Sequence, residues 1–254
     1  MPKSSSFAGQ SPALSYRSIT VPQALSSQLW SAEVQATTPI EHRYQEADER
    51  RLRQKLLLCK NQWGDQHLET LAVLEELGNV LLVQGRYRSA EETFRRLAAG
   101  CRAVYGDNHS KTFDALNGLG RVFERQGLHD KAEKLHLNNL EARKTLLGAE
   151  HPDTLTSMAN LASTFWNKGR WDEAEELGLQ VMETSKRVLG PEHPSTLTSM
   201  NNLSFTWKAM GKQAEALKLI DECVQLTKLI LGVDHPRFLS SSATLGAWRL
   251  EDEG

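Results

Sequence analysis

The sequence predicts an all-α protein, a right-handed α-solenoid built from antiparallel helical hairpins. Three observations lead to this prediction: a strict 42-residue period, apolar residues at helical spacing within each period, and glycines where a hairpin must turn. Five glycines carry the period, and each is followed three positions later by a histidine. They are Gly64, Gly106, Gly148, Gly190 and Gly232, with His67, His109, His151, His193 and His235.

The first 40 residues do not follow this period. They contain nine serines and four of the eight prolines, without sustained apolar spacing. Such a composition buries too little apolar surface to fold alone, so residues 1–40 are expected to be largely disordered. The alternative for residues 21–34 is a short helix docked on the array.

Residues 41–63 predict a capping helix at the N-terminal end of the array. The stretch 44–49 resembles 87–92, which belongs to the second helix of a repeat, and no helix breaker follows before Gly64. This segment therefore corresponds to a second helix without its first.

Residues 64–231 form four full repeats: 64–105, 106–147, 148–189 and 190–231. Counted from the opening glycine, positions 8, 11, 14 and 18 are apolar, and steps of 3, 3 and 4 place them on one face of a helix. Position 15 is always small, which lets another helix approach closely. Its residues are Gly78, Gly120, Ala162 and Ser204.

Glycine at position 22 ends the first helix, and alanine at position 27 lies in the second. Pro152, Pro194 and Pro236 stand where the following helices begin, a place where proline is tolerated. Residues 232–254 supply one further helix and an acidic tail, a half repeat. A single hairpin cannot bury both of its apolar faces, so neighbouring hairpins must stack.

These residues resemble the tetratricopeptide repeat, and the 42-residue period is similar to that of kinesin light chains. The resemblance covers residues 64–250 and is carried most clearly by residues 147–161 and 189–203. It implies a superhelix whose first helices line a concave surface that binds peptides. Similar arrays also occur behind a nucleotide-binding module.

Composition excludes several classes of function. With 30 basic and 32 acidic residues the net charge is −2, so the basic excess of a nucleic-acid binder is absent. No apolar run approaches the roughly 18–20 residues of a membrane span. The three cysteines form no C-x-x-C pair, which indicates packing residues in a reducing compartment. We expect a cytoplasmic protein with neither a nucleic-acid nor a membrane partner.

The five histidines in register invite a metal hypothesis. Stacked helices lie about 8–10 Å apart, too far for histidines of successive repeats to share an ion with bonds near 2 Å. No phosphate-binding loop, nucleophile elbow or H-E-x-x-H motif is present. The sequence therefore predicts no metal, no cofactor and no enzymatic activity, and each imidazole is expected to pack and hydrogen-bond in its turn.

The candidate binding residues are polar or aromatic residues of the first helices that lie off the apolar stripe. Asparagine carries both a donor and an acceptor, so a ladder of asparagines can hold the backbone of an extended peptide. Asparagine is also a weak helix former, which favours function over a solvated helix face. The set is Asn79, Asn117, Arg121, Arg125, Asn160, Trp166, Asn167, Asn201, Asn202 and Lys208.

Asn160 and Asn202 match the position by which similar arrays hold peptide backbones, as the resemblance implies. Trp166 is open between ligand contact and packing. The sequence thus predicts a protein–protein interaction module that binds an extended peptide segment. The alternative is a regulatory or sensor region derived from a larger nucleotide-switch (NB-ARC-like) protein. Self-association through the C-terminal half repeat is a further possibility, since its apolar face lacks a second helix.

Overall fold

The computed structural model describes residues 39–252, and the regular structure in this range is entirely helical. The helices are α2 (Pro39–Trp63), α3 (Leu68–Val83), α4 (Tyr87–Tyr105), α5 (Ser110–Arg125), α6 (His129–Leu147), α7 (Pro152–Asn167), α8 (Trp171–Val188), α9 (Pro194–Ala209), α10 (Gln213–Leu231) and α11 (Pro236–Asp252). Each helix packs on the next along the series. This arrangement confirms the predicted all-α solenoid.

The N-terminal boundary differs slightly from the expectation. Pro39 and Ile40, assigned by sequence to the irregular segment, are the first residues of α2. Proline suits the first turn of a helix, where its missing N–H has no partner to lose. The expectations for residues 1–38, including a helix over 21–34, lie outside the described residues.

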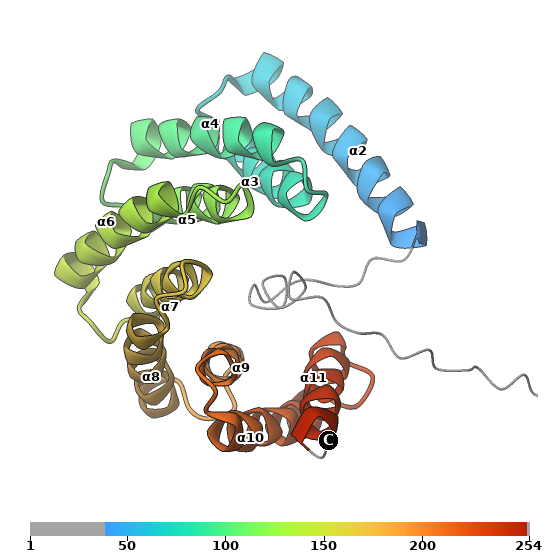
Figure 1. Cartoon of the computed structure of the whole chain (residues 1–254). Helices are drawn as coiled ribbons and strands as arrows, with labels where there is room; N and C mark the ends of the chain where they lie inside the picture. Colours follow the sequence, from blue (N-terminus) through green and yellow to red (C-terminus); the bar gives the residue numbers. More distant parts are fainter. Residues whose placement is uncertain (1–38, 253–254) are drawn as a thin grey trace, which may run out of the picture.

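The helices form two layers along an arc. Figure 1 shows α3, α5, α7, α9 and α11 on the inner side and α4, α6, α8 and α10 on the outer side. The inner helices α3, α5, α7 and α9 also contact one another in sequence. The first helix of each hairpin therefore faces the concave side.

The turns between hairpins repeat one set of hydrogen bonds. The Nδ1 atom of each of the five register histidines accepts from the backbone N–H two residues later, at 3.1–3.3 Å. This is a helix N-cap. His67 and His109 also stack on Trp63 and Tyr105, with ring centroids 4.8 and 4.5 Å apart. The expected hydrogen bonding is confirmed for all five imidazoles, and ring packing for His67 and His109.

A buried threonine completes four of the five turns that open with the position-1 glycines. Its hydroxyl donates to the carbonyl of the opening glycine at 2.7–2.8 Å. The four threonines are Thr70, Thr112, Thr154 and Thr196. The glycines at positions 1 and 22 all have φ between 72° and 93°, a conformation that residues with a side chain rarely adopt.

Close packing within a hairpin follows a size rule between positions 15 and 31. A Cβ atom on Gly78 would lie 2.9 Å from the ring of Phe94, and one on Gly120 would lie 2.4 Å from His136. In the third hairpin both positions are small, since Ala162 stands at position 15 and Gly178 at position 31. The position-27 alanines, which are Ala90, Ala132, Ala174 and Ala216, are fully buried.

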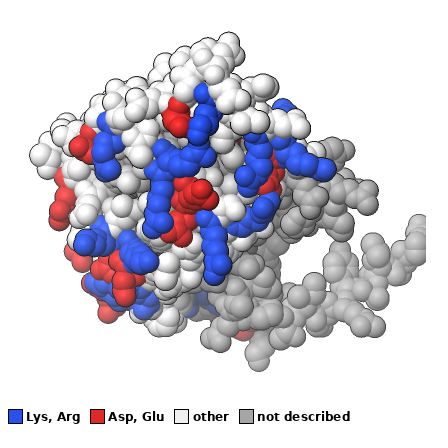
Figure 2. All heavy atoms as spheres, turned by 90° about the horizontal axis from the view of Figure 1, so that it is seen from above, with Lys and Arg blue, Asp and Glu red and all other residues white. Residues whose placement is uncertain are grey.

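A ladder of glutamates links successive hairpins. Each stands at the same place on an outer helix and accepts a hydrogen bond from the hairpin that follows. The pairs are Glu49 with Arg86, Glu91 with Gln126, Glu133 with Arg170, and Glu175 with Lys212. Seen from above, the surface shows basic and acidic side chains side by side (Figure 2). Within residues 39–252, no helix combines the length and the apolar character needed to cross a membrane.

Candidate peptide-binding surface

The candidate surface is the set of solvent-reaching side chains on α3, α5, α7 and α9, on the inner side of the arc, and we refer to it as the concave face. Its helices are fixed in place by the apolar stripe beneath them, where residues such as Leu77, Leu161 and Leu203 are at most 3% exposed. The polar side chains therefore project from a preformed scaffold.

Asn160 and Asn202 occupy the same repeat position on α7 and α9, and both are half-buried. The backbone carbonyl of Asn160 accepts from Thr164, at 3.1 Å. Among residues 39–252 the side-chain amide of Asn160 makes no hydrogen bond. Its donor and acceptor are thus available to another chain.

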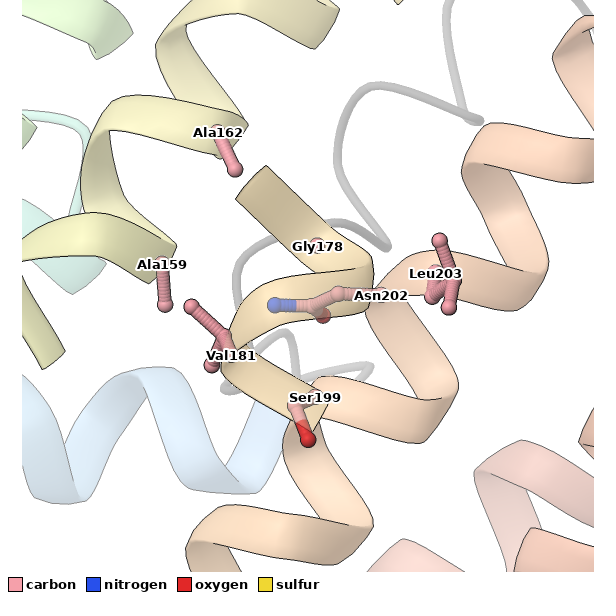
Figure 3. Close-up of a pocket in the computed structure, with 7 residues that line it drawn as sticks. All are labelled: Ala159, Ala162, Gly178, Val181, Ser199, Asn202 and Leu203. Carbon is pink, nitrogen blue, oxygen red and sulfur yellow. The ribbon is translucent and has the colours of Figure 1, made fainter. Parts of the chain in front are cut away.

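Asn202 lies against a small hollow between α7, α8 and α9 (Figure 3). Its lining residues are Ala159, Ala162, Gly178, Val181, Ser199, Asn202 and Leu203. The hollow has a volume of about 10 Å³, which is about the room for one water molecule. The amide oxygen of Asn202 is buried without a hydrogen-bond partner in the described part of the chain, so this asparagine is only partly directed to the surface.

Asn117 and Asn201 are engaged within the array. Asn117 is 7% exposed, and its amide oxygen accepts from the Asn139 amide at 2.8 Å. Asn139 also donates to the carbonyl of Phe113, at 3.0 Å. Asn117 therefore lies inside the second hairpin rather than on the concave face. The buried Asn139 on the facing helix needs a polar partner, and Asn117 supplies it. Asn201 accepts from Ser241 of α11, at 3.5 Å.

The two remaining asparagines of the set have fewer constraints. Asn79 of α3 is exposed, and Asn167, the last residue of α7, is half-buried. Asn160 and Asn167 are seven positions apart on α7 and lie on one face of that helix, whereas Asn79 is separated from them by α5.

Charged groups concentrate on α5. Arg121 and Arg125 are half-buried there and flank Glu124, whose side chain is 13% exposed. The hydroxyl of Thr164 donates to Glu124 at 2.6 Å, and the Nε2 atom of the buried His136 lies 3.8 Å from the same carboxylate. Burial raises the pKa of Glu124 to about 7, against the opposing effects of Thr164 and the two arginines.

Lys208 and Trp166 lie toward the C-terminal end of the concave face. The Lys208 ammonium donates to Gln213 at 2.6 Å and to Glu251 at 2.7 Å, and it stands 5.5 Å from the ring centroid of Trp248. Trp166 is half-buried and packs on the apolar cluster around Phe205. Lys208 thus ties α9 to α11, and Trp166 combines packing with partial exposure.

Two features of the structure were absent from the expectations. The Glu124–His136 contact carries no repeat signal, because position 19 is Leu82, Glu124, Trp166 and Lys208 in successive hairpins. The glutamate ladder does carry one, since its four members stand 42 residues apart. A search for periodic polar residues would have found the ladder but not the buried pair.

The family model for the tetratricopeptide repeat matches residues 69–137, 112–178 and 158–228. These matches span more than half of the chain. No curated protein gives a significant match to the sequence.

Several solved structures are similar to most of the chain. The nearly identical TPR-like repeats of Podosopora anserina, named after the kinesin light chain, are 23% identical with a TM-score of 0.59, over 81% of this chain and 94% of theirs. BtubC (BKLC) from P. vanneervenii is 18% identical with a TM-score of 0.64, over 84% of each chain. Bacillus thuringiensis PlcR, solved with the peptide PapR7 and DNA, is 13% identical with a TM-score of 0.57, over 85% of this chain and 77% of that one. At these identities the likeness establishes the fold.

Proposed function

The chain belongs to the tetratricopeptide repeat family, and from this premise we propose that it is an interaction module that holds an extended segment of a partner protein on its concave face. The observation that carries the proposal is the half-exposed Asn160, whose amide makes no hydrogen bond within the described residues. An amide in this state can exchange a donor and an acceptor with one peptide unit of a bound segment.

The scaffold supports this function energetically. The inner helices are positioned by their own core, so binding orders few protein groups and loses little free energy to that ordering. Arg121 and Arg125 beside the largely buried Glu124 give the middle of the surface a basic character, with Glu75 and Glu76 toward the N-terminal end. We infer a ligand whose two ends carry opposite charges.

The remaining aspects of the proposal concern partners and location. The balanced charge supports a protein rather than a nucleic-acid partner, with no cofactor and no catalytic role. The cysteines Cys59, Cys101 and Cys223 are buried free thiols, which supports a cytoplasmic location. A second copy of the chain remains a candidate partner at α11.

The test uses peptides selected from a random library displayed against the full chain, with affinities measured by fluorescence anisotropy. We expect Asn160→Ala to weaken binding by about tenfold, since two hydrogen bonds to the peptide are lost. Asn202→Ala should weaken it less, because its amide oxygen is turned inward. Asn138→Ala is the matched control, an exposed asparagine on the outer helix α6.

Backbone recognition has its own signature. Methylation of one central peptide nitrogen should reduce affinity more than replacement of the same residue by alanine. The asparagine-ladder hypothesis fails if Asn160→Ala binds like the wild type. The concave-face proposal fails if only substitutions on the outer helices reduce the affinity for the selected peptides.

A further inference from the structure

Helix α11 exposes an apolar residue whose counterparts are covered in the other hairpins. Leu239 is 56% exposed, whereas the four residues at its repeat position are 3–5% exposed. These are Leu71, Phe113, Leu155 and Leu197. Their cover is the second helix of their own hairpin: a Cβ on Gly100 of α4, for example, would lie 2.5 Å from Leu71.

The exposed face continues along the whole of α11. Ala243, Gly246, Ala247 and Leu250 follow Leu239 at helical spacing and are all exposed, Leu250 by 74%. We call these five residues the α11 face. The face carries no charge, and its flanking residues Arg249 and Glu251 are already paired with Asp221 and Lys208.

Gly246 gives this face a specific shape. It stands at position 15, like Gly78 and Gly120, but a Cβ on Gly246 would have nothing within 4 Å. In those two hairpins the space above the glycine holds a ring, that of Phe94 or of His136. Because no atom of the described residues lies within 4 Å of this place, it is open to a ring in the register of Phe94 or His136.

We propose that the α11 face docks an amphipathic α-helix of a partner protein, antiparallel to α11, with an aromatic ring seated on Gly246. The docked helix continues the interfaces α3·α4, α5·α6, α7·α8 and α9·α10 and lies beside α10 in the outer layer. By analogy with α4, it carries a small residue four positions before the ring and an apolar residue three positions after it, like Ala90 and Leu97 around Phe94. This site lies on α11, whereas the concave face is defined on α3, α5, α7 and α9.

The probe is a synthetic peptide with the sequence of α4, residues 87–105, added to the full chain under reducing conditions. Binding is followed by fluorescence anisotropy, and helix formation by circular dichroism. We expect the α4 peptide to bind and become helical, and its Phe94→Ala form to bind about tenfold more weakly, because the ring is the main buried group. The α8 peptide, with Gly178 at the ring position, is the natural weak binder.

The surface is tested from the other side by Gly246→Leu, which fills the place of the ring. This residue is exposed in mid-helix, so the variant should keep its thermal stability and lose the α4 peptide. Leu239→Ser is the second variant, with the same expected loss. Asn160→Ala should bind the α4 peptide normally, which separates this site from the concave face.

Three results would overturn the proposal. The first is equal affinity for the α4 peptide and its Phe94→Ala form. The second is peptide binding that survives Gly246→Leu. The third is a dimer of the chain, detected by sedimentation velocity and abolished by Gly246→Leu, because that result assigns the α11 face to a second copy.

Discussion

At the scale of single residues, Glu124 and His136 couple protonation to stability in opposite directions. Both prefer their neutral form in the folded chain, because burial raises the pKa of the carboxyl to about 7 and lowers the pKa of the imidazole to about 4. The nearby Arg121 also lowers the pKa of His136. The neutral carboxyl stabilises the fold at low pH, whereas the neutral imidazole stabilises it at high pH.

The first prediction separates the two groups by their pH profiles. The contribution of Glu124 is complete below its ordinary pKa of 4.5 and is lost as pH rises through about 7. The free energy of unfolding of Glu124→Gln should therefore rise relative to that of the wild type as pH increases from 4.5 to 8, by up to roughly 3 kcal/mol.

His136→Phe should show the reverse trend. The contribution of His136 is complete above its ordinary pKa of 6.5 and is lost as pH falls through about 4. This variant copies the Phe94–Gly78 contact. Its free energy of unfolding should rise relative to that of the wild type as pH falls. Urea unfolding at pH 4.5, 6 and 8 measures the free energy of unfolding of both variants. If the difference from the wild type is the same at each pH, neither group changes its pKa on folding.

At the scale of the helix pair, the size of one residue sets the size allowed at its partner. Phe94 is 2% exposed and lies between Gly78 of its own hairpin and Gly118 of the next. Gly178, at the position of Phe94, leaves the hollow beside Asn202 (Figure 3). Glycine is therefore required at residue 118, against the Phe94 ring, whereas at residue 178 it is only tolerated.

The second prediction compares one substitution at two glycines. A Cβ on Gly178 would lie 3.2 Å from a terminal methyl of Leu203, which can shift, so Gly178→Ala should stabilise by about 0.5–1 kcal/mol through helix propensity. A Cβ on Gly118 would lie 2.2 Å from the Phe94 ring, so Gly118→Ala should destabilise by about 1–3 kcal/mol. Thermal unfolding of both variants measures this, and a loss of equal size at Gly178 would contradict the reading of the hollow.

At the scale of the whole molecule, Arg143 holds three helices together. Its side chain is 1% exposed on α6 and donates to Asp114 of α5 at 2.7 Å. It also donates to the carbonyl of Asp153 and to the hydroxyl of Ser157, both on α7, at 3.0 and 3.2 Å. The buried guanidinium thus couples the second hairpin to the third.

The third prediction ranks the loss of stability caused by substitutions at Arg143 and Asp114. Asp114→Ala leaves a buried guanidinium without its counter-charge and should destabilise by on the order of 3 kcal/mol. Arg143→Met removes the charge, fills much of the volume and leaves Asp114 45% exposed to water, so it should cost less. The double variant should recover part of the Asp114→Ala loss. If Arg143→Met is the costlier change, Arg143 contributes chiefly through packing.

The period-42 signals fixed the helices because they act locally. Glycines with positive φ end helices, prolines 152, 194 and 236 start them, and apolar steps of 3 and 4 define the buried face. Each of these effects depends on residues close in sequence. The order of the helices and their stacking could therefore be predicted before any coordinates, as could the hydrogen bonding of His151 and its equivalents.

The fate of the candidate asparagines depended on residues far away in sequence. Asn117 and Asn160 both lie on the polar side of a first helix, yet Asn117 is buried because the residue opposite, at position 34, is Asn139. That position holds Leu97, Val181 and Cys223 in the other hairpins, which offer no amide. The sequence by itself determined the array and its two layers, and the tertiary structure decided which polar groups face solvent, because that depends on the side chain each one meets across the interface.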